Sequence, residues 1–113
     1  MMVGRVEAVH SAARAFLVEA MTELMTVTDI GGDRLVQARA RLRAASAHAA
    51  ESALRIVEML AADAGSTAIF ESCPLERAVR DVQAAVKHVA MSPSSYVLTG
   101  RLSLGLGSGL SRF

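Results

Sequence analysis

The stretch from Arg34 to about Ala64 is the feature that most limits how this chain can fold. It contains neither proline nor glycine, and alanine dominates its middle. Apolar residues recur along it at intervals of three and four, the period of one helical face. Such a helix would be about 45 Å long, and its alanines would let neighbouring backbones approach closely. The predicted seam consists of Leu35, Ala38, Leu42, Ala45, Ala49, Ala53, Ile56 and Leu60.

A helix is also predicted from Val3 to about Met25, before the break at TVTDIGGD. Asp33 at the end of that break is a natural N-cap for the long helix. A second apolar stripe, Val18, Met21 and Met25, lies off the face that would pack on the long helix. The apolar packing stripe itself is Val6, Val9, Ala13, Phe16, Leu17, Ala20 and Leu24. This helix therefore has two apolar sides to bury, and a single chain offers a partner for one of them. The second side predicts self-association.

The remainder of the chain predicts two shorter helices. Pro74 suits the first turn of a third helix, and Gly65 is the expected stop before it. Ser92 is a cap for a fourth helix, which starts at Pro93 and ends near Gly105. We therefore expect a single all-α domain over residues 1–113: an antiparallel helical bundle of three main helices plus a short C-terminal helix.

Composition narrows the classes of function. The 113 residues carry a formal net charge of +1 and 4% aromatic residues, which does not favour a nucleic-acid partner. No apolar run approaches the roughly 18 residues of a membrane span. The first ten residues reach a Glu and a His too soon for a signal peptide, and one cysteine cannot form an internal disulfide. The expected location is the cytoplasm.

Most isolated polar residues are interpreted as structural. His10, His48 and His88 match no metal-ligand spacing, so no metal site is predicted, and the first two are interpreted as helix-surface residues. Cys73 is interpreted as an inert thiol. Glu51 and Arg55 have the i, i+4 spacing of a surface ion pair. The arginines of the long helix are interpreted as a solvated or interfacial flank; they are Arg34, Arg39, Arg41 and Arg43.

An ordered set of short motifs follows the long helix. A glycine turn is followed by Pro-Leu-Glu-Arg at 74–77, Arg-Asp at 80–81, His88, Ser-Pro at 92–93, and finally Tyr96, Gly100, Arg101 and Leu104. In this order the motifs resemble the end of the C-terminal helical domain of the acyl-CoA dehydrogenase fold. They resemble more closely its flavin-dependent monooxygenase (hydroxylase) branch. The resemblance is strongest over residues 65–107.

The resemblance implies a site around the third helix. In the dehydrogenases a catalytic carboxylate commonly follows the Arg-Asp helix, but here that step falls on Val89, Ala90 and Met91, which cannot act as a base. The hydroxylases place histidine in this helix near a reduced flavin, where it can assist proton transfer. That likeness makes His88 the catalytic candidate. The positions implied to line the flavin, FMN or FAD, are Gly65, Ser66 and Ser92.

Relative to a complete member of that fold, the N-terminal helical domain and the middle β domain have no counterpart in these residues. The leading hypothesis is thus a C-terminal domain or remnant of such a monooxygenase, with little turnover alone. The cofactor that the resemblance implies is reduced flavin, and the sequence leaves open whether the isolated chain holds it or has none. Its partners would be further copies in a dimer or tetramer, a flavin reductase, or the missing enzyme domains. The alternative is a helical oligomerisation module that has lost catalysis. An unrelated bundle with chance similarity is the third interpretation.

Overall fold

The computed structural model describes residues 2–64, 74–87 and 94–107. Within these ranges the chain forms helices and turns without a strand, which confirms the predicted all-α class. The helices are α1 (Met2–Val27), α2 (Gly32–Ala64), α4 (Pro74–Val86) and α5 (Ser94–Ser103).

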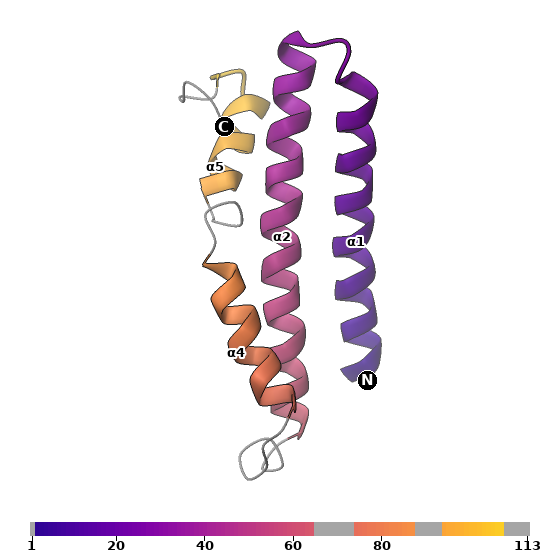
Figure 1. Cartoon of the computed structure of the whole chain (residues 1–113), viewed down its shortest axis with the longest axis vertical. Coiled ribbons are helices and arrows are strands. Elements are labelled where there is room, and N and C mark those ends of the chain that lie inside the picture. The colour runs from indigo at the N-terminus through magenta and orange to yellow at the C-terminus, as the bar shows by residue number, and fades with distance from the viewer. Residues whose placement is uncertain (1, 65–73, 88–93, 108–113) are drawn as a thin grey trace.

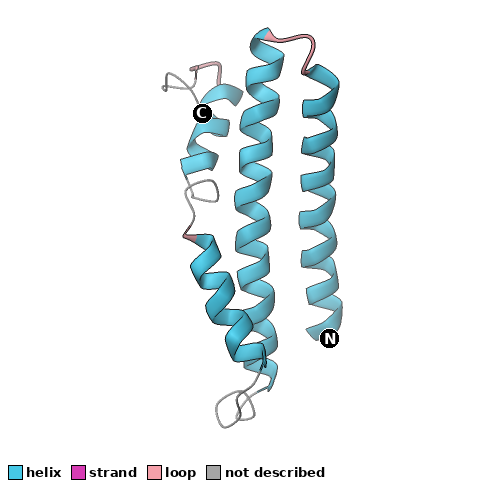
Figure 2. Ribbon diagram, viewed as in Figure 1, coloured by secondary structure: helices cyan, strands magenta, loops and turns pink. Residues whose placement is uncertain are grey.

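α2 is the central element of the fold (Figures 1 and 2). α1 runs antiparallel along one side of it, and α4 and α5 follow one another along the other side. The main helix contacts are those of α2 with each of the other three. The molecule measures 54 × 25 × 22 Å, and its long dimension is about that of a 33-residue helix.

Alanine forms most of the core, as the composition of the long helix predicted. Ala13 and Ala20 of α1 are buried, and so are Ala38 and Ala45 of α2. All the residues of the two predicted packing stripes are buried or half-buried. Val27 is the largest side chain with less than 2% exposure. The core between α1 and α2 is consequently thin, because small side chains bury little apolar area.

Two glycines make the turn between α1 and α2. Gly31 and Gly32 have φ angles of 70° and 64°, the left-handed region that side chains with a Cβ disfavour. The amides of Ile30 and Gly31 donate to the Val27 carbonyl at 3.0 and 3.2 Å. α2 begins at Gly32, so Asp33 lies in its first turn, where a carboxylate is favourable beside the helix N-terminus.

α5 ends in a Schellman motif, close to the predicted stop at Gly105. The Leu106 amide donates to the Arg101 carbonyl at 2.9 Å, and the Gly105 amide donates to the Leu102 carbonyl at 3.1 Å. Gly105 has a φ of 76°. The Arg101 side chain also donates to the carbonyls of Leu106 and Gly107, both at 3.2 Å.

None of the described helices combines the length and the apolar character needed to cross a membrane.

Candidate functional site

All four residues predicted for the flavin site lie outside the described residues. They are Gly65, Ser66, His88 and Ser92. Cys73 also lies outside the described residues. Of the neighbouring motif, Arg80 and Asp81 lie on α4 with exposed side chains. These assignments remain predictions.

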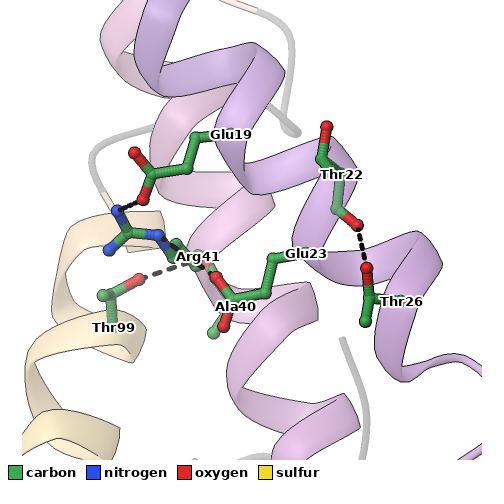
Figure 3. Close-up of polar contacts among 7 residues, drawn as sticks. All are labelled: Glu19, Thr22, Glu23, Thr26, Ala40, Arg41 and Thr99. Atoms are coloured by element: carbon green, nitrogen blue, oxygen red, sulfur yellow. Dashed lines mark hydrogen bonds and ion pairs between the residues drawn. The ribbon is translucent and has the colours of Figure 1, made fainter.

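Arg41 on α2 lies at the centre of a cluster of polar contacts (Figure 3). Its Nη2 atom donates to Glu19 Oε1 of α1 at 2.7 Å, and its Nε atom lies 3.5 Å from Glu23 Oε2. Glu19 and Glu23 are one helical turn apart, so their carboxylates face the same arginine. The cluster ties α1 to α2 electrostatically. Because the side chains of Arg41 and Glu19 are 41% and 67% exposed, water screens this pair.

Aromatic contacts continue the cluster into the interface between α1 and α2. The Arg41 guanidinium carbon lies 5.0 Å from the centroid of the Phe16 ring, within cation–π range. The Phe16 ring lies 5.9 Å from that of His48, at 54°. His48 is therefore half-buried against a neighbouring helix, which corrects its interpretation as a surface residue. Arg41 Nε is buried without a hydrogen-bond acceptor of good geometry, because the Glu23 contact is long.

A polar groove of about 600 Å³ lies beside this cluster, between α1, α2 and α5. Its cation, Arg41, is already paired with Glu19 and Glu23, so the groove offers an anion no unpaired positive charge. The lining residues are Glu19, Glu23, Gln37, Ala40, Arg41, Thr99, Leu102 and Ser103.

Two hydrogen bonds fasten α5 to α2. The Thr99 hydroxyl lies 3.1 Å from the Ala40 carbonyl of α2, which is the first of these bonds. The same hydroxyl lies 3.0 Å from the Ser95 carbonyl within α5. The Tyr96 hydroxyl donates to Glu51 Oε2 at 2.9 Å. Burial, together with the Glu51 carboxylate, raises the pKa of Tyr96 to about 12. Glu51 thus has a partner on another helix, in place of the i, i+4 pair with Arg55 that its spacing suggested.

An apolar groove of about 260 Å³ separates part of α1 from α2. Ser52, 6% exposed, lies among its lining residues, with His10 and Arg14 from α1. The other lining residues are apolar: Ala13, Leu17, Ala49, Ala53 and Ile56.

Neither groove provides a flavin site from the described residues alone. The larger carries two carboxylates and a paired arginine, which is poor chemistry for a flavin phosphate. The smaller falls below the roughly 300 Å³ of typical ligand pockets. Nor do three His, Cys, Asp or Glu side chains gather as metal ligands anywhere in the described ranges. We therefore derive no reaction step from these grooves.

Sequence reasoning missed the Arg41 cluster and the pair of Tyr96 with Glu51. The spacing of Glu19 and Glu23 was visible, but their partner is 22 and 18 positions away, across a turn whose geometry decides which residues meet. Tyr96 and Glu51 are 45 positions apart, and no local pattern links them.

Comparison with known proteins gave two findings. The family model described as acyl-CoA dehydrogenase, C-terminal domain, matches residues 1–93. A curated protein, the indole-3-acetate monooxygenase of Pseudomonas putida, is 30% identical over 103 residues, which cover 91% of this chain and 26% of that protein. No solved structure gave a significant match.

Proposed function

The chain belongs to the acyl-CoA dehydrogenase family through that family's C-terminal domain, and from this premise we propose that it serves as the helical C-terminal domain of a flavin-dependent monooxygenase. The observation that carries the proposal is the similarity to a monooxygenase along 91% of the chain. The chain spans about a quarter of that relative's length, 26%. Most of the active site would therefore come from other domains, and the chain alone would have little turnover.

Within that proposal, the flavin contacts of this domain come from Gly65, Ser66 and Ser92, and His88 assists proton transfer. Reduced flavin, FMN or FAD, would supply the oxygen chemistry for hydroxylating a small aromatic substrate in the cytoplasm, with a separate reductase reducing the flavin. Imidazole suits the proton-transfer role because its ordinary pKa is near neutrality.

Flavin titration tests this site. We expect oxidised or reduced FMN or FAD to bind weakly, with the dissociation constant raised at least about tenfold by His88→Ala. His10→Ala is the matched control, because His10 is exposed on α1 and outside the proposed site. Equal binding by both variants would remove His88 from the proposal. No binding by any form would leave the flavin contacts to the other domains and contradict the roles of Gly65, Ser66 and Ser92.

A second candidate is a non-enzymatic helical association module. Its support is the accessible surface, which is 7674 Å² for a chain of 11.9 kDa. A compact monomer of that mass exposes about 5,900 Å², so about 1,700 Å² is in excess. A standard interface buries about 800 Å² on each partner. Light scattering at tens of micromolar should detect oligomers; a strict monomer would contradict this candidate.

A further inference from the structure

One flank of α1, beside its contact with α2, carries a narrow stripe of exposed residues. We call it the α1 outer stripe: Val3, Glu7, Arg14, Val18, Met21 and Met25. At about 100° per residue these positions fall within an arc of about 60°. Its apolar members are well exposed, with Val3 at 74%, Val18 at 50%, Met21 at 48% and Met25 at 77%. α4 and α5 lie on the other side of α2 from α1 (Figure 1). The exposure of the stripe residues agrees with neither helix covering them.

The two charged members have no partner within the described chain. Neither Glu7 nor Arg14 forms a salt bridge or hydrogen bond with another described residue. By contrast, Glu19 and Glu23 on the same helix share Arg41 of α2. Glu7 and Arg14 are about 10 Å apart along α1, too far to pair with each other. Each therefore has a charge available to a second molecule.

The α1 outer stripe is complementary to the same stripe of a second copy that runs in the opposite direction. Positions 7 and 14 have the same midpoint, between residues 10 and 11, as positions 3 and 18. If a second α1 lies antiparallel about a two-fold axis at this midpoint, each Glu7 faces Arg14 of the other copy. Each Val3 then lies against Val18 of the other copy, next to Met21. A two-fold interface presents the same patch on both subunits, so every favourable pair occurs twice.

We propose that two copies of this chain associate through the α1 outer stripe, with their α1 helices antiparallel and crossing at residues 10 and 11. This interface rests on the association module, the second candidate function. The two can be told apart, because the chain can dimerise in another register. The surface excess of the whole chain, about 1,700 Å², is larger than the roughly 800 Å² that a standard interface buries on each partner. The apolar groove is continuous with it, because His10 and Arg14 border both.

Charge selects this register over its nearest competitor. Moving the axis to residue 14 would place Val3 against Met25, but it would bring the two Arg14 guanidinium groups together. Like charges at an interface are unfavourable and specify against that arrangement. A second competitor overlaps only the C-terminal halves, with Val18 against Met25, and leaves Glu7 and Arg14 unpaired.

A charge exchange tests the proposed pairs. Glu7→Arg alone places two arginines opposite each other at both pairs, and Arg14→Glu alone does the same with glutamates. Each variant should dimerise at least about tenfold more weakly than the parent in sedimentation velocity. An equimolar mixture of the two variants restores both opposite-charge pairs and should form heterodimers with the parent's affinity. Glu58→Arg, an exposed change on α2, is the control for net charge and should leave the affinity unchanged.

The outcomes are separable. Weak singles with a restored mixture support the register. Singles that dimerise like the parent, or a mixture that remains monomeric, overturn it even where the parent is a dimer. A monomeric parent overturns both this register and the association module, whereas the flavin titration tests the monooxygenase proposal independently.

Disulfide mapping gives a second readout that does not depend on charge. In a Cys73→Ser background, Val3→Cys and Val18→Cys should cross-link to each other when mixed and oxidised. Either variant alone should not, because its two thiols would be about 22 Å apart across the axis. A Val18→Cys and Met25→Cys cross-link instead would identify the C-terminal overlap and overturn the proposed axis.

Discussion

At the scale of the residue, the phenol of Tyr96 is held in its protonated form by its surroundings. Burial and the hydrogen bond to Glu51 raise its pKa to about 12, from 10.0. A group whose pKa is higher in the folded protein adds stability that is complete below the unfolded pKa and disappears as the pH rises through the folded one. The relevant window is therefore about pH 10 to 12.

We expect Tyr96→Phe to remove this alkaline loss of stability. The parent should lose stability relative to Tyr96→Phe between pH 9 and pH 12, in urea unfolding followed by circular dichroism. Because Tyr96 is 36% exposed, the difference should stay below about 1 kcal/mol. Tyr96 is the only tyrosine, so no second phenol complicates the comparison. Parallel pH profiles for the two proteins would contradict the assignment.

The Arg41 cluster should contribute more through packing than through charge. Glu19→Gln should cost less than about 0.5 kcal/mol, because the ion pair is exposed. Arg41→Ala should cost about 1 kcal/mol or more, since it also removes the stem and the contact with the Phe16 ring. Urea unfolding measured in low salt and in 1 M NaCl separates the two contributions. Only the Glu19→Gln effect should vanish in high salt, and equal effects of both changes would refute this division.

At the scale of the element, a glycine within α5 and one just beyond its C-terminal end should respond oppositely to alanine. Gly105 has a φ of 76° at the helix end, so Gly105→Ala should destabilise by about 1 kcal/mol. Gly100 lies inside α5, where a Cβ would meet no described side chain or other helix within 4 Å, so Gly100→Ala should stabilise by up to about 1 kcal/mol. Thermal unfolding measures both. The same sign for both variants would show that packing, and not backbone conformation, decides the result.

The helices and the packing faces of α1 and α2 were predictable because the order of residues within each segment determines them. The three-four spacing fixes which face packs, and the alanines at positions such as 38 and 45 fix how closely it packs. Cross-helix pairs were not predictable. Arg41 reaches Glu19 only because the turn at Gly31 and Gly32 sets the register of α2 against α1. The predicted flavin site, including His88, stays a prediction because its residues lie outside the described ranges.

At the scale of the whole molecule, the chain is long for its size. Its radius of gyration is 17.0 Å, against about 13 Å for a compact domain of this length. A structure with a thin alanine core and surplus surface should gain stability from association. We expect the melting temperature to rise by several degrees between about 1 and 100 μM protein. Glu7→Arg should flatten this dependence, and a melting temperature independent of concentration in the parent would contradict it.

The central place of α2 also has a kinetic consequence. The main contacts of α1, α4 and α5 are all with α2, so one of these helices can separate while the main contacts of the others remain. α2 cannot unwind without releasing all three. Native-state hydrogen exchange should therefore divide the backbone amides into tiers. Those in the middle of α2 should exchange only when the entire protein opens, whereas those of α5 should exchange through a smaller and more frequent opening.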